Sequence, residues 1–142
     1  MDISEQINRL EEKAISLKNA KKYLESLKKY EEVIQLKKEA LGDRNESTIR
    51  TSSEAAIVCN ILSMSFLQKG NSIYVDELCL ENYAVALELL KKAEAFTEDG
   101  DRYRAVTYNN FACIFRRTKK LRSALSYLEK ALEIEYNYLH FS

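Results

Sequence analysis

Apolar residues recur at intervals of three and four along most of the chain, an interval that places them on one face of an α-helix. The clearest apolar stripe lies in the last third, where Leu121, Leu125, Leu128 and Leu132 follow this interval. The whole pattern predicts six helices, at about residues 4–19, 22–41, 47–69, 77–97, 101–117 and 120–138.

Glycine and polar residues mark the ends of these predicted helices. Gly42, Gly70 and Gly100 each follow a helical stretch, where glycine commonly caps a helix C-terminus in a left-handed conformation. Polar residues after Gly42 and Gly100 can cap the next helix at its N-terminus. The stretch 71–80 breaks the periodicity, and we expect a surface loop at residues 71–75.

The composition narrows the fold class to all-α. The 142 residues suffice for one domain, and they include no proline, no tryptophan and only three glycines. Sandwiches and barrels need many turns that contain glycine or proline, and nucleotide-binding loops need clustered glycines. These classes are therefore excluded.

Charge and hydropathy exclude two classes of partner. The 22 basic residues balance the 22 acidic ones, so no net field attracts nucleic acid or an anionic membrane. No apolar run approaches the roughly 18 residues of a membrane span, and the polar start MDISEQINRL is unlike a secretory signal. The cations between Arg116 and Arg122 are interpreted as a solvated turn. We expect a cytoplasmic protein that binds neither nucleic acid nor membranes.

The residues that could perform chemistry are few and scattered. Cys59, Cys79 and Cys113 lie far apart, and the single histidine, His140, is near the end of the sequence. A metal site needs convergent histidine and cysteine ligands, and a nucleophile needs an adjacent base. We therefore expect no catalytic residue, no metal site and no cofactor, and the chain is predicted not to be an enzyme.

A repeated order of small and bulky residues joins the predicted helices into pairs. In the last third this order consists of Tyr108, Phe111, Ala112, Phe115, Ala124, Leu128 and Ala131. It resembles the tetratricopeptide repeat (TPR), a helix pair of about 34 residues. The alanines are small where the two helices of a pair would cross.

Two earlier segments fit the same template less closely. Their matching residues are Leu10, Ala14, Leu17, Ser26, Tyr30 and Val33, and then Leu62, Ser63, Phe66, Gly70, Ala86, Leu90 and Ala93. The sequence LGDRNEST at residues 41–48 is similar to the link between repeats of the kinesin-light-chain type. Lys119 stands where the family has a turn glycine, and proline, usual at the end of a repeat, is missing. These departures affect the turns and leave the core pattern intact.

The TPR resemblance implies a fold and its domain organisation. It implies a right-handed superhelical stack of three antiparallel helix pairs, an α-solenoid. We expect a single domain over residues 1–142, with pairs at about 4–41, 47–97 and 101–138.

The resemblance also implies a concave groove that binds peptides, lined by the first helix of each pair. By the same register, the partner-binding residues would be Ile57, Asn60, Ile61, Met64, Leu67, Val106, Asn109, Asn110, Cys113, Arg116 and Arg117. Family members that bind chaperone tails clamp a terminal carboxylate with lysine, asparagine and arginine. The corresponding positions here hold Glu11, Ile15, Ile61, Val106 and Asn110, so a chaperone-type clamp is absent.

Two functions follow from this pattern. The first is a non-catalytic protein–protein interaction module, an adaptor or scaffold whose apolar groove binds a peptide or helix of a partner. The alternative is a structural subunit or homodimer whose groove and ends are buried in a larger assembly. The groove stripe could also be covered by the protein itself. The identity of the partner is not encoded in these patterns.

Overall fold

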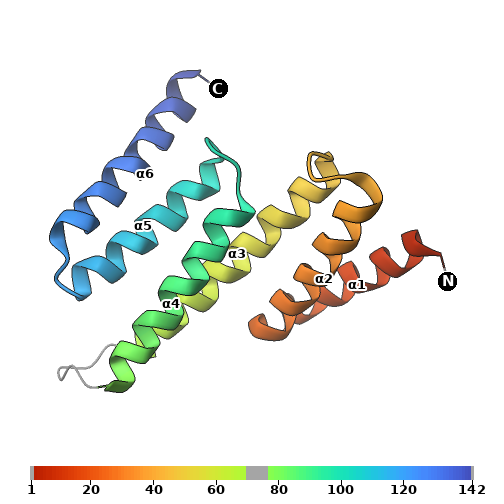
Figure 1. Cartoon of the computed structure of the whole chain (residues 1–142), viewed down its shortest axis with the longest axis horizontal. Coiled ribbons are helices and arrows are strands. Elements are labelled where there is room, and N and C mark those ends of the chain that lie inside the picture. Colours follow the sequence, from red (N-terminus) through yellow and green to blue (C-terminus); the bar gives the residue numbers. More distant parts are fainter. Residues whose placement is uncertain (1, 70–76, 142) are drawn as a thin grey trace. The chain divides into compact units, whose positions relative to one another are not determined.

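The computed structural model describes residues 2–69 and 77–141, with the backbone alone at 77–80. Helices account for nearly all of these residues. The chain divides into two compact units, Met1–Val58 and Cys59–Ser142. The described residues form six helices, as the periodicity predicted: α1 (Ile3–Asn19), α2 (Tyr23–Leu41), α3 (Glu46–Lys69), α4 (Glu77–Phe96), α5 (Arg102–Arg117) and α6 (Leu121–Phe141) (Figure 1). The first unit takes α1, α2 and α3 up to Val58, and the second takes the remainder. The all-α class is confirmed.

Aspartate side chains cap the N-termini of α1 and α5. Asp2 accepts a hydrogen bond of 2.9 Å from the backbone N–H of Glu5, and Asp101 accepts one of 2.8 Å from that of Tyr103. Each bond satisfies an N–H that has no partner within its own helix. At the end of α2, Gly42 has φ +91°, which confirms its predicted role as a C-terminal cap. Gly70 and the loop predicted at residues 71–75 lie outside the described residues.

The end of α4 agrees with the predicted end near residue 97, but the capping residue differs from the prediction. The helix ends at Phe96, four residues before Gly100, and the next residue, Thr97, turns the chain. The Thr97 hydroxyl donates to the carbonyl of Ala93 at 3.2 Å, which satisfies one of the last carbonyls of the helix. Gly100 has φ +83° but lies in the turn that follows, so it is not the helix cap.

Lysine takes the left-handed turn position in two helix pairs. Lys21 has φ +63° and Lys119 has φ +61°. In both turns the N–H of the next residue reaches back five residues: Lys22 to the Leu17 carbonyl at 2.9 Å, and Lys120 to the Phe115 carbonyl at 2.7 Å. This is the bond of the Schellman motif, which usually has glycine at the left-handed position. The absence of glycine therefore leaves the turn geometry unchanged.

Small residues face each other within each helix pair, as the repeat template predicted. The Ser26 hydroxyl on α2 donates to the Ala14 carbonyl on α1 at 2.8 Å. The Ser63 hydroxyl on α3 donates to the Ala86 carbonyl on α4, also at 2.8 Å. In the last pair both positions are alanine, and Ala112 on α5 and Ala124 on α6 are buried. Residues of this size let the two backbones of a pair approach closely.

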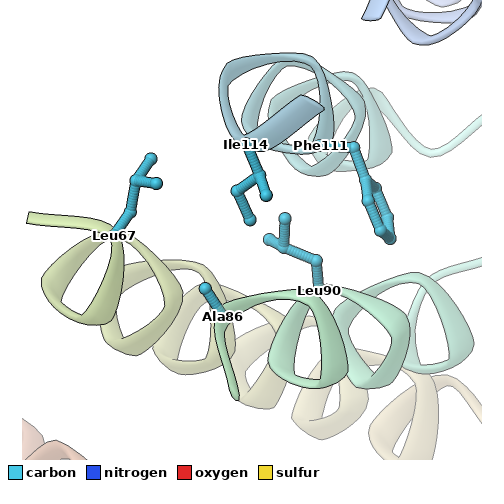
Figure 2. Packing of buried hydrophobic residues seen from close by; sticks show 5 residues of the cluster. All are labelled: Leu67, Ala86, Leu90, Phe111 and Ile114. Atoms are coloured by element: carbon cyan, nitrogen blue, oxygen red, sulfur yellow. The ribbon is translucent and has the colours of Figure 1, made fainter. Parts of the chain in front are cut away.

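An apolar cluster holds α3, α4 and α5 together in the second unit. Figure 2 shows Leu67 of α3, Ala86 and Leu90 of α4, and Phe111 and Ile114 of α5, all buried in this cluster. Partly buried rings extend the cluster to α6, where Tyr127 stacks on Phe111 with 4.6 Å between ring centroids. The helix α5 therefore packs against its neighbours on both sides.

The first unit has a polar link among its three helices. The Lys37 ammonium lies 3.1 Å from the Glu11 carboxylate and 2.7 Å from the Thr51 hydroxyl. The Thr51 hydroxyl also donates to Glu11 at 3.2 Å. A buried ammonium is costly unless it is paired, and here α1 and α3 supply both partners of a lysine on α2.

We predict that Ala112→Leu lowers the free energy of unfolding by about 1–3 kcal/mol, because the added atoms overpack the crossing of α5 and α6. Urea denaturation measures the change. Ala95→Leu, at an exposed position on α4, is the matched control and should stay within about 0.5 kcal/mol of the wild type. Equal stability of the Ala112→Leu variant and the wild type would contradict the crossing.

A second prediction concerns alkaline stability. Burial, with the nearby carboxylates of Glu54 and Glu11, raises the pKa of Tyr30 from 10.0 to about 12. Between these values the unfolded chain loses the phenol proton while the folded chain keeps it, so stability falls as pH rises. We expect this tyrosine to contribute a loss of about 1 kcal/mol per pH unit there. Unfolding at pH 9 and pH 11 should show a smaller alkaline loss in Tyr30→Phe than in the wild type; identical losses would refute the assignment.

Candidate functional site

A surface groove runs between α3 and α5 in the second unit. It has a volume of about 460 Å³ and is lined by Asn60, Ile61, Met64, Ser65 and Gln68 of α3 and by Tyr103, Val106 and Asn110 of α5. Five of the eleven residues predicted from the sequence line it: Asn60, Ile61, Met64, Val106 and Asn110. The predicted register therefore brings residues of both helices to one site.

The lining combines apolar and amide side chains without a charged residue. Ile61 and Met64 are partly exposed one turn apart on α3, and Val106 faces them from α5 with 39% of its surface exposed. The exposed Gln68 and the half-buried Asn110 supply polar atoms at this apolar surface. Such a surface suits an apolar side chain whose neighbouring backbone needs hydrogen bonds.

A chain of hydrogen bonds beneath the groove fixes its two helices together. The Asn60 amide donates to the Thr107 hydroxyl at 2.9 Å, and the Asn110 amide donates to the Asn60 carbonyl oxygen at 2.7 Å. Asn60 is only 2% exposed, so its amide is part of the interface between α3 and α5. Sequence reasoning placed Asn60 in the groove and did not anticipate this packing role.

The other six predicted residues do not line this groove. Leu67 is buried in the apolar cluster, and Cys113 is partly buried against it. Arg117 donates to the Leu67 carbonyl at 3.2 Å and so joins α5 to α3. Asn109 and Arg116 are exposed. Ile57 belongs to the first unit.

Three of the eight lining residues, Ser65, Gln68 and Tyr103, are not among the eleven residues predicted from the sequence. Tyr103 precedes Val106 by three positions, and Ser65 follows Ile61 by four, so each shares a helix face with a residue that was predicted. Extending the predicted stripe by one turn along α5 would have found Tyr103.

Ion pairs engage two charged residues of α1 in the first unit. Glu11, at one of the clamp positions, is paired with Lys37 and Thr51 in the first unit. Lys18 is 3.2 Å from the Glu54 carboxylate.

In the described part of the chain, no three or more histidine, cysteine, aspartate or glutamate side chains are placed to hold a metal ion. Among the described helices, none is long and apolar enough to cross a membrane.

We predict that Asn60→Ala lowers the free energy of unfolding by about 1–3 kcal/mol, because the Thr107 hydroxyl and the Asn110 amide lose a buried partner. Asn109→Ala, at the exposed position next to Asn110, is the matched control and should change stability by less than about 0.5 kcal/mol. Urea denaturation compares the two. Equal losses would show that the hydrogen-bond chain contributes nothing.

Comparison with known proteins identifies the architecture of this second unit. Residues 75–135 match the family model of the tetratricopeptide repeat, a span that takes in α4, α5 and most of α6. No curated protein and no solved structure was found to match the chain. The TPR family in general provides protein–protein interaction modules and is non-catalytic. The similarity of residues 41–48 to a kinesin-light-chain link lies outside the match and stays a prediction. With the small-residue crossings and the repeated turn geometry, this match identifies residues 75–135 as a segment of the tetratricopeptide repeat type.

Proposed function

We propose that this chain is an adaptor or scaffold that binds an apolar segment of a partner protein in the groove between α3 and α5. The proposal depends on one observation, the partly exposed apolar surface of Ile61, Met64 and Val106 within a groove of about 460 Å³. This volume lies within the range of sites that take up small ligands or single anchoring side chains.

The lining indicates what kind of segment would bind. Burial of an apolar anchor against Ile61 and Val106 would supply the affinity, and the flexible thioether of Met64 would adapt to its shape. A peptide backbone beside that anchor needs partners for its N–H and C=O groups, and Gln68 and Asn110 offer an amide on each helix. Because no charged residue lines the groove, an acidic tail is a poor ligand.

We place this module in the cytoplasm. Among the residues whose side chains are described, Cys59, which is buried, and Cys113, which is partly buried, form no disulfide. Cysteines without disulfides are typical of a reducing compartment.

Selection from a library of displayed random peptides tests the proposal. We expect wild-type protein to enrich peptides with one or two large apolar residues. Ile61→Asp places a carboxylate against that anchor and should weaken binding of the selected peptides by about 100-fold, or about 3 kcal/mol, in a fluorescence anisotropy titration.

The matched control is Val85→Asp, which introduces the same carboxylate at an exposed apolar position on α4, outside the groove. Circular dichroism should show both variants folded, because Ile61 and Val85 are not core residues. Selected peptides that bind Ile61→Asp as tightly as Val85→Asp would refute the groove as the binding site.

A further inference from the structure

A row of four leucines is exposed along α6. Leu121, Leu125, Leu128 and Leu132 each have between 47 and 69% of their surface exposed. Leucines on a monomer surface are usually scattered singly, and a contiguous apolar row marks a place of contact. This row lies outside the groove between α3 and α5.

The packing of α6 on α5 determines which way this row points. Ala124 and Ala131 are buried, and Tyr127 between them stacks on Phe111 of α5. Leu125, Leu128 and Leu132 each follow one of these residues by one position, and Leu121 lies one turn before Leu125. The row therefore occupies the adjoining face of the helix, about 100° around its axis. It is therefore held in a fixed orientation by a packed neighbour.

The spacing of the row is that of a coiled-coil seam. Its steps of four, three and four residues alternate as the a and d positions of a heptad do. In this register Leu121 and Leu128 take the d positions. Arg122 and Glu129, which follow them, flank the seam one heptad apart and carry opposite charges. On the other flank are Ala124 and Ala131, which are buried and carry no charge.

We propose that this row binds the same row of a second copy of the chain, with the two α6 helices antiparallel. The two-fold axis passes between Leu125 and Leu128. Leu121 then faces Leu132 of the second copy, and Leu125 faces its Leu128. Arg122 of each copy lies beside Glu129 of the other, so one contact contains two ion pairs.

The charges select this arrangement over its alternatives. In a parallel pair the charged flank of one helix would meet the uncharged alanine flank of the other, and no ion pair would form. An antiparallel pair shifted by one heptad would place Glu129 beside Glu129 of the second copy, where like charges repel. An antiparallel pair is also isologous and closes as a dimer, so it leaves no leucine row exposed for further growth.

Sedimentation equilibrium of the whole chain over a range of concentrations tests the proposal. We expect a reversible dimer. Leu132→Lys, at a position 69% exposed, should raise the dimer dissociation constant by about 100-fold or more, because symmetry places the lysine in the contact twice. Leu24→Lys, at a position 55% exposed on α2, is the matched control and should dimerise as the wild type does. A wild-type chain that stays monomeric at millimolar concentration, or a dimer that survives Leu132→Lys, would overturn the proposal.

Charge exchange tests the register and uses variants that leave every leucine in place. Arg122→Glu and Glu129→Arg should each dimerise about tenfold more weakly than the wild type, because each brings like charges together. An equimolar mixture of the two variants should recover a heterodimer near wild-type affinity, because the ion pairs form again between copies. A mixture no tighter than either variant alone would overturn the antiparallel register. Ile61→Asp should leave the dimer unchanged, which separates this surface from the groove.

Discussion

The close approach of two helices within each pair is the constraint on which the rest of the structure depends. A serine hydroxyl bonded to an alanine carbonyl makes that approach in the first two pairs, with Ser26 on Ala14 and Ser63 on Ala86, both at 2.8 Å. The side chain at this crossing must be small enough to fit. Its hydroxyl also needs a buried acceptor, because a buried hydroxyl without a hydrogen bond lowers the stability of the fold. In the second unit this crossing orients α3 so that Leu67 enters the apolar cluster while Ile61 and Met64 stay at the surface.

Within that unit, α5 is joined to its neighbours by two different kinds of interaction. Toward α4 the contact is apolar, through Leu90 and Ile114. Toward α3 it includes the buried amide of Asn60, which has to align with Thr107 and Asn110 to be satisfied. Apolar packing tolerates small sliding motions, whereas a buried hydrogen-bond chain specifies one arrangement. The groove therefore forms beside the contact that fixes α3 and α5 most specifically.

The sequence predicts the helices well and the site only in part, for physical reasons. Periodicity and caps are local, so the six helices could be found, and Lys119 could be placed at a turn without glycine. The end of α4 was predicted to within one residue, but its cap was predicted wrongly, because Thr97, bonded to its own helix, takes the place expected for Gly100. In the site, Asn60 has a partner 47 positions away in the chain, and no local pattern separates such a buried asparagine from an exposed one. Residues one turn apart, such as Met64 and Leu67, lie on either side of the boundary between groove and core.

Charge distinguishes the two apolar surfaces of the second unit and argues for different kinds of partner. Apolar contact alone is not directional, so polar neighbours decide the orientation of whatever binds. The groove has amides and no charges beside Ile61 and Val106, and in the proposed function these amides would pair with a peptide backbone whatever its sequence. The leucine row of α6 has Arg122 and Glu129 on one flank, a pattern that is complementary to itself when reversed. A surface of the first kind can accept many segments with a suitable apolar residue, whereas one of the second kind favours a single partner in a single register.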